Sequence, residues 1–138
     1  MIVAGSDSGG GAGIQADIKT VTALGGFAMT AVTALTAQNT QGVSGIHDVP
    51  ADFVAEQMRA VLGDLGADCI KIGMLHRADV IETVCKVLDV HAPGVPIVCD
   101  PVMVAKGGAS LLDAAALHAL KHALIPRATL LTPNVPEA

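Results

Sequence analysis

Aromatic residues are almost missing from this sequence, since its 138 residues include Phe27 and Phe53 but neither Trp nor Tyr. Because 51% of the chain is nevertheless hydrophobic, the core must consist of Val, Ile, Leu, Ala and Met. Such an aliphatic composition is typical of buried parallel strands covered by helices. A chain of this length corresponds to about one domain. We therefore expect a single α/β domain over residues 1–138.

Basic clusters, long apolar runs and a leader sequence are also missing. The formal net charge is −5, and no patch of Lys and Arg suggests a nucleic-acid surface or an anionic membrane as partner. No run of about eighteen apolar residues could span a membrane. Met1 leads directly into apolar residues, without the charged leader and cleavage site of a signal peptide. These absences predict a soluble cytoplasmic protein that binds neither nucleic acid nor membrane.

Cysteine pairs that could hold a metal or form a disulfide framework are absent as well. Cys69, Cys85 and Cys99 are odd in number and widely spaced, so we expect reduced, buried thiols. Among the histidines only His118 and His122 have a tight spacing, at i and i+4. We expect that pair on a solvated helix surface.

The chain does have a glycine-rich opening at residues 2–17, IVAGSDSGGGAGIQAD. A short apolar strand at 2–4 leads there into a glycine loop and then into an amphipathic helical pattern. Glycine lets the backbone approach a ligand, and the first N–H groups of a helix have no partner within it. We therefore expect a polar or anionic ligand beside this loop. The dinucleotide fingerprint and the P-loop pattern both fail against it, which argues against a Rossmann-type oxidoreductase.

Asp17 is unusual for its position on the first helix. At about 100° per residue it falls on the same side as Ile14, Val21 and Leu24. A carboxylate on an apolar stripe is costly unless it has a partner. Contact with a ligand and a buried capping bond are the two alternatives, and we favour the ligand.

Strand-like and helical stretches alternate along the rest of the chain. The Gly25-Gly26 pair should end the first helix. Strands are then expected at 27–36, 43–49, 68–73, 95–99 and 129–132, and helices from Pro50 onward, at 78–90 and at 111–124. This alternation predicts βαβ units and a three-layer αβα fold with a mainly parallel sheet.

In such a sheet, ligands sit at the carboxyl ends of the strands. We expect the segments at these ends to line one crevice: Gly5-Ser6-Asp7, Gln38-Asn39, Gly73-Met74, Asp100-Pro101 and Pro133-Asn134. The amides of Gln38 and Asn39 can donate and accept at once, which suits the edge of a heteroaromatic ring. The alternative is that they satisfy the backbone of their own turn.

Two later groups suggest phosphate or metal chemistry. Asp100 is followed by Lys106 and two glycines, a carboxylate for a metal and a mobile cation with free backbone donors for phosphate. Asn134 and Glu137 lie three residues apart, so Glu137 could hold Mg²⁺. The same spacing describes a capping box, and from these residues alone the cap is favoured.

Five motifs follow one another in the chain: AGSDSGGGAGIQAD, TALTAQNTQGV, IKIGML, CDPVMVAKGG and LLTPNVPEA. Together they resemble the hydroxymethylpyrimidine and phosphomethylpyrimidine kinases of thiamine biosynthesis, within the ribokinase-like superfamily. The resemblance covers essentially the whole chain. It implies that an aminopyrimidine is bound by Gly5, Asp17, Gln38 and Met74, with Val102 as a further wall of the pocket.

The same resemblance implies roles for the later groups. Asp100 and Lys106 would lie near the phosphates and the metal, and Asn134 and Glu137 would serve Mg-ATP. The implied activity is an ATP-dependent, Mg²⁺-assisted kinase that phosphorylates 4-amino-5-hydroxymethyl-2-methylpyrimidine and then its monophosphate, in a homodimer. A pyridoxal kinase of the same superfamily and a non-catalytic pyrimidine-binding module are the alternatives.

Two departures from the family pattern stand out. The first loop has Ser8 and Gly9 after Asp7, where members often have Pro and Ser, a change that keeps its loop character. The second glycine loop, which in the family surrounds the transferred phosphoryl group and supplies the catalytic residue, has no counterpart in the 138 residues. We therefore expect a ribokinase-like fold truncated at its C-terminus, and a chain that is inactive on its own.

Overall fold

The computed structural model describes residues 1–103 and 112–138. A six-stranded sheet has the order β3-β2-β1-β4-β5-β6. Its strands are β1 (Ile2–Asp7), β2 (Thr30–Asn39), β3 (Gly42–Asp48), β4 (Ile70–Ile72), β5 (Ile97–Cys99) and β6 (Leu130–Leu131). All neighbours pair in parallel except β3, which is antiparallel to β2. The mainly parallel sheet is confirmed.

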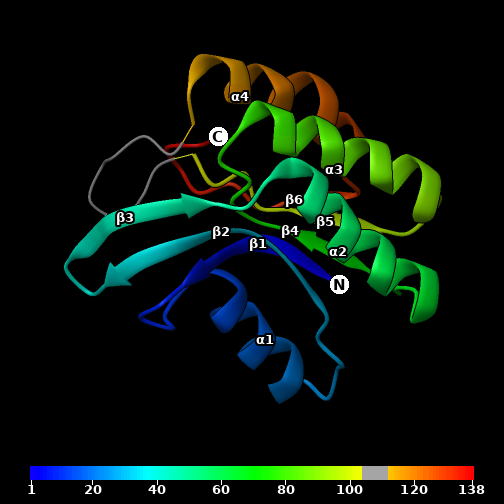
Figure 1. The fold of residues 1–138 in the computed structure, drawn as a ribbon, viewed down its shortest axis with the longest axis horizontal. Coiled ribbons are helices and arrows are strands. Elements are labelled where there is room, and N and C mark those ends of the chain that lie inside the picture. The colour runs from blue at the N-terminus through cyan, green and yellow to red at the C-terminus, as the bar shows by residue number, and fades with distance from the viewer. Residues whose placement is uncertain (104–111) are drawn as a thin grey trace.

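Helices cover both faces of this sheet (Figure 1). On one face lies α1 (Gly13–Ala23), and on the other lie α2 (Ala51–Asp64), α3 (Ala78–His91) and α4 (Ala114–Ala119). The last of these continues as a π-helical turn (Leu120–Leu124) and a 3-10 turn (Ile125–Arg127). From β1 to β2 the chain moves one way across the sheet, and from β4 to β6 the other way. Right-handed crossovers then place α1 opposite α3 and α4, which confirms the three-layer fold.

The core is unequal on the two faces. Under α2, α3 and α4 lies a large aliphatic cluster that includes Met58, Ile72 and Val84, each 0% exposed. Under α1 the cluster is small and centres on Ile2, Ala4 and Ile14. Both phenylalanines are exposed, so the aliphatic core predicted from the composition is confirmed.

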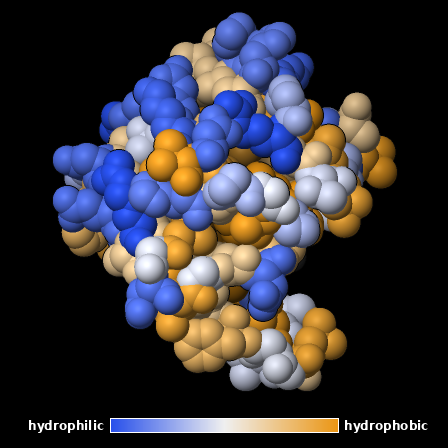
Figure 2. All heavy atoms as spheres, turned by 90° about the vertical axis from the view of Figure 1, so that its right-hand side faces the viewer, coloured by the Kyte–Doolittle hydropathy of each residue, from blue (hydrophilic) through white to orange (hydrophobic). Residues whose placement is uncertain are grey.

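The apolar stripe predicted for α1 holds only in part. Leu24 is 83% exposed because the helix ends at Ala23 and Gly25 turns the chain away with a φ of +81°. Phe27, in the segment that follows, is also exposed. The α1 end of the molecule, at the bottom of Figure 2, accordingly carries apolar side chains on its surface.

Several predicted boundaries shift in the structure. The first strand continues past Ala4 to Asp7, and the second begins at Thr30. Helix α4 begins at Ala114, because the Asp113 carboxylate accepts from Ala116 N at 2.7 Å and caps it; residue 111, where we expected its start, lies outside the described residues.

The cysteines and histidines follow the predictions with one exception. Cys85 and Cys99 are buried, but Cys69 is exposed because it lies in the loop before β4. His118 and His122 lie on the surface as expected, with ring centroids 4.4 Å apart. None of the described helices is long and apolar enough to cross a membrane.

Candidate functional site

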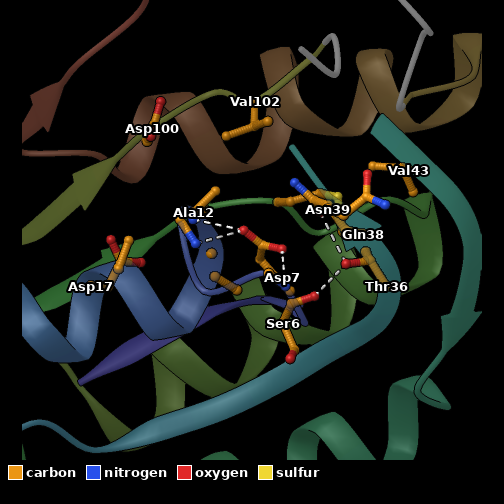
Figure 3. A pocket seen from close by; sticks show the side chains of 18 of the residues that line it. Ser6, Asp7, Ala12, Asp17, Thr36, Gln38, Asn39, Val43, Asp100 and Val102 are labelled. Atoms are coloured by element: carbon orange, nitrogen blue, oxygen red, sulfur yellow. Dashed lines mark hydrogen bonds between the residues drawn. The ribbon is translucent and has the colours of Figure 1, made fainter. Parts of the chain in front are cut away.

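The strand order reverses at β1, which has β2 on one side and β4 on the other. Ligands of open α/β sheets bind beyond the carboxyl ends of the strands at such a point. A cavity of about 520 Å³ lies there, between the β1–α1 loop, the β2–β3 turn and the ends of β4 and β5 (Figure 3). This cavity is the candidate site.

All the residues predicted to bind substrate line this cavity, and so does one of the two predicted metal ligands: Gly5, Asp17, Gln38, Met74, Val102 and Asp100. The other predicted metal ligand, Glu137, is not part of the lining. In Figure 3, Asp17 and Asp100 lie toward one end and Gln38 toward the other. Four of the five expected strand-end segments therefore meet. The fifth, Pro133-Asn134, is not part of the lining.

The glycine loop is organised by Asp7, which the sequence analysis placed at the crevice without giving it a role. Its carboxylate accepts from Gly9 N (2.8 Å), Gly11 N (2.9 Å) and Ala12 N (2.8 Å). Asp7 is only 5% exposed. These N–H groups were expected to face a ligand, but Asp7 occupies them instead. Aspartate just before a glycine turn commonly bonds the following backbone, and that was the available signal.

Asp17 does not make the capping bond that was one of its two alternatives, and its contact with a ligand stays a prediction. Lys71, on β4, donates from Nζ to Asp17 Oδ2 at 2.8 Å. The N-cap of α1 is Ala12, and no side chain caps the helix. The need of this carboxylate for a partner was predicted correctly. The partner was missed because Lys71 is remote in sequence, although it interrupts an apolar strand between Ile70 and Ile72.

The two neighbouring amides at the end of β2 have different partners. Asn39 Oδ1 accepts from Gln41 N (2.8 Å) and Gly42 N (3.3 Å), which is the turn-satisfying alternative. The Thr36 hydroxyl lies 3.0 Å from Gln38 Oε1 and 2.7 Å from Ser6 O, so its one proton is shared between them. Gln38 is thus held at the cavity by its side chain (Figure 3).

Apolar groups form the walls of the cavity. Met74 and Val102 line it, together with Val43 from β3. A Cβ added at Gly5 would lie 2.6 Å from Met74 Cε. Glycine at this position therefore leaves room for the methionine side chain.

Asp100 lies where burial and charge act against each other. Burial raises the pKa of its carboxyl above the ordinary value, the Lys71 ammonium lowers it, and the Glu137 and Asp17 carboxylates raise it further. Lys71 Nζ lies 3.9 Å from Asp100 Oδ2. A cation bound at Asp100 would relieve this excess of negative charge. The adjacent Cys99 is inert at neutral pH, since burial raises the pKa of its thiol to about 11.

Asn134 and Glu137 form the reciprocal cap that their spacing allowed. Asn134 N donates to Glu137 Oε2 and Glu137 N donates to Asn134 Oδ1, both at 3.1 Å. Met103 N donates to Glu137 Oε1 at 3.1 Å. This bond ties the cap to the segment that follows Asp100. Lys106 lies outside the described residues.

Comparison with known proteins gives consistent matches. The family described as phosphomethylpyrimidine kinase matches residues 7–138. The thiamine biosynthesis bifunctional protein ThiED of Geobacter sulfurreducens is 56% identical over 138 residues, which are 100% of this chain and 28% of that protein. The hydroxymethylpyrimidine/phosphomethylpyrimidine kinase of Bacillus subtilis is 54% identical over 100% of this chain and 51% of its own length.

Solved structures agree with these matches. The phosphomethylpyrimidine kinase of Clostridium difficile 630 superposes with a TM-score of 0.92 and 43% identity, over 99% of this chain and 58% of that one. The pyridoxal kinase of Staphylococcus aureus in complex with pyridoxal gives 0.85 and 35%, over 99% and 50%. The chain spans about half the length of most of these proteins, and less of the bifunctional one. Because the family match extends over nearly the whole sequence, the chain belongs to the phosphomethylpyrimidine kinase family.

Proposed function

We propose that the intact protein carrying this chain is an ATP-dependent kinase of 4-amino-5-hydroxymethyl-2-methylpyrimidine and of its monophosphate. The observation that carries the proposal is the cavity itself, which places Asp17 and Gln38 around a space walled by Met74 and Val102. A carboxylate can accept a hydrogen bond from an amino group, and an amide can donate one to a ring nitrogen. The apolar walls suit the faces of the ring.

The phosphate end of the site would lie at Asp100. Phosphoryl transfer requires positioning and charge neutralisation. We propose Asp100 and Glu137 as the residues that would hold Mg²⁺, Asn134 and Glu137 as ATP-binding, and Lys106 beside the phosphates. When bound there, Mg²⁺ would neutralise negative charge on the phosphates. No group of three His, Cys, Asp or Glu side chains within 1–103 and 112–138 could hold a metal, but Mg²⁺ often needs only one or two carboxylates besides phosphates.

The chain's own residues then have defined tasks. Asp17 and Gln38 would fix the ring so that its hydroxymethyl group points along the cavity toward Asp100. Asp7 would hold the glycine loop after Gly5 in the conformation that lines the pocket.

Exposed Leu35 and Ile46 on the β2–β3 hairpin support our further proposal of a homodimer. We also propose the cytoplasm as the location of the protein.

The second candidate is a pyridoxal kinase, which the likeness to the Staphylococcus aureus structure favours. Such an enzyme phosphorylates a hydroxymethyl group on a pyridine instead of a pyrimidine. The aminopyrimidine is preferred because Asp17 has an amino group to pair with on that ring. The two candidate activities can be distinguished by assaying both substrates with the same protein.

The test is a coupled kinase assay of the intact protein with ATP, Mg²⁺ and each substrate in turn. We expect turnover of hydroxymethylpyrimidine and of its monophosphate, and little or none of pyridoxal. Omitting Mg²⁺ should abolish the activity. Turnover of pyridoxal alone would contradict the proposal and favour the second candidate.

A further inference from the structure

Lys71 lies in the middle of the sheet, on the face that carries the cavity. Its neighbours Ile70 and Ile72 are 0% exposed and belong to the core under α2, α3 and α4. Alternation along the strand therefore places Lys71 on the α1 face. Its side chain is 29% exposed. A half-buried ammonium at the floor of a pocket is costly unless it is paired.

Two carboxylates from different elements share this one cation. Asp17, from α1, accepts from Lys71 Nζ at 2.8 Å, and Asp100, after β5, lies 3.9 Å from the same atom. All three residues line the cavity. Gly73 makes room for the lysine, since a Cβ there would lie 3.1 Å from Nζ. Within the described ranges, no other cation pairs with either carboxylate.

The ion pair leaves the two oxygens of Asp17 in different states. Oδ2 is held by Lys71, and no donor in the described part of the chain is bonded to Oδ1. A carboxylate with one oxygen held keeps a fixed plane, so its other oxygen is preorganised as a single acceptor. Without Lys71 the carboxylate could rotate, and it would face Asp100 without an intervening positive charge.

We propose that Lys71 is a positioning residue of the substrate site: it orients Asp17 toward the amino group of the pyrimidine and couples Asp17 to the neighbouring Asp100. This inference rests on the proposed function. In this role Lys71 acts through Asp17. The same ammonium lies near both the carboxylate proposed to bind the ring, Asp17, and the carboxylate proposed to hold the metal, Asp100.

The test is calorimetric binding of hydroxymethylpyrimidine to the intact protein without ATP, for Lys71→Met, Lys71→Gln and Lys71→Arg. The two neutral variants, either of which suffices if the other does not fold, should bind about tenfold more weakly, within the range shown by coupled neighbours. Lys71→Arg should recover most of the affinity. Lys86→Met, an equal charge change at an exposed position of α3, should bind normally.

A double-mutant cycle distinguishes positioning from a merely structural role. In an Asp17→Asn background, where the ion pair is already lost, the neutral change at Lys71 should have little further effect on affinity. A structural role would instead lower the melting temperature and weaken binding equally in both backgrounds, and that result would overturn the inference. Normal binding by Lys71→Met would also overturn it. If the unaltered protein does not bind the pyrimidine, the proposed function fails and this inference falls with it.

Discussion

At the residue scale, Gln38 and Asn39 show that a shift of one position along a strand changes the partner of a side chain. They carry the same functional group and follow one another in β2, but only Asn39 uses its carbonyl oxygen to close the β2–β3 turn. Gln38 is held at the cavity through Thr36. From the sequence alone, either amide could bind a ligand or close the turn. The position of the turn decides between these roles, and that position depends on the pairing of β2 with β3.

We predict that Gln38→Ala weakens binding of hydroxymethylpyrimidine by about 1–3 kcal/mol, because the ring atoms that it pairs with would be buried without a partner. Stability should hardly change, since the side chain contributes little to the core. Calorimetry on the intact protein measures the affinity. Gln41→Ala, the same change at an exposed position outside the cavity, is the matched control. Unchanged affinity in Gln38→Ala would remove this residue from the site.

At the element scale, the β1–α1 loop is closed by its own aspartate. Three backbone N–H groups of the loop before α1, the last of them at the helix N-cap Ala12, donate to Asp7, which is almost fully buried. The negative charge that the helix N-terminus attracts is therefore supplied from within the chain. A glycine-rich loop of this composition predicts an anion at that place but not whether the anion is a ligand or a side chain.

Replacing Asp7 should therefore cost stability. We expect Asp7→Ala to lower the free energy of unfolding by about 2–4 kcal/mol, because three backbone N–H groups lose the charged carboxylate that accepts from them. Denaturant unfolding of the intact protein, followed by circular dichroism, measures the loss. Asp64→Ala, at the exposed end of α2, removes the same charge without those bonds. An equal effect of the two substitutions would show that the loop does not depend on Asp7.

Elements with a complete periodic pattern are predictable from the sequence. The helix expected at 78–90 is found as Ala78–His91, because its apolar face packs fully on the sheet. The direction of β3 was not predicted, since alternation along a strand does not specify its orientation. The roles of Asp7 and Lys71 were missed for a related reason. Their partners are set by backbone turns and by strand order, which the local pattern does not contain.

At the scale of the whole molecule, the two faces of the sheet are covered unequally. The strand register places Lys71, Val98 and Leu130 side by side across β4, β5 and β6, on the α1 face. Helix α1 packs on β1, at the other half of the sheet. Leu130 is 54% exposed and Leu131, on the opposite face, is 39% exposed. Within the described residues, β6 is therefore an edge strand with apolar side chains open on both faces.

This edge leads to the last prediction, that residues 1–138 expressed alone associate and do not catalyse phosphoryl transfer. An exposed apolar edge strand pairs readily with other chains, so Leu130→Lys should reduce association in light scattering. Leu65→Lys, at an exposed leucine after α2, should not.

The expectation for catalysis follows from the family resemblance. Removing one donor from an oxyanion-type site typically costs about 10²–10³ in rate, and the second glycine loop has no counterpart in the 138 residues. The pyrimidine side of the cavity is present, so the isolated chain could still bind the ring while failing to phosphorylate it. The measurement is ATP-dependent phosphorylation of hydroxymethylpyrimidine by a monodisperse preparation. Sustained turnover would mean that Lys106, Asn134 and Glu137 suffice for the transfer step, and that catalysis does not need the second loop.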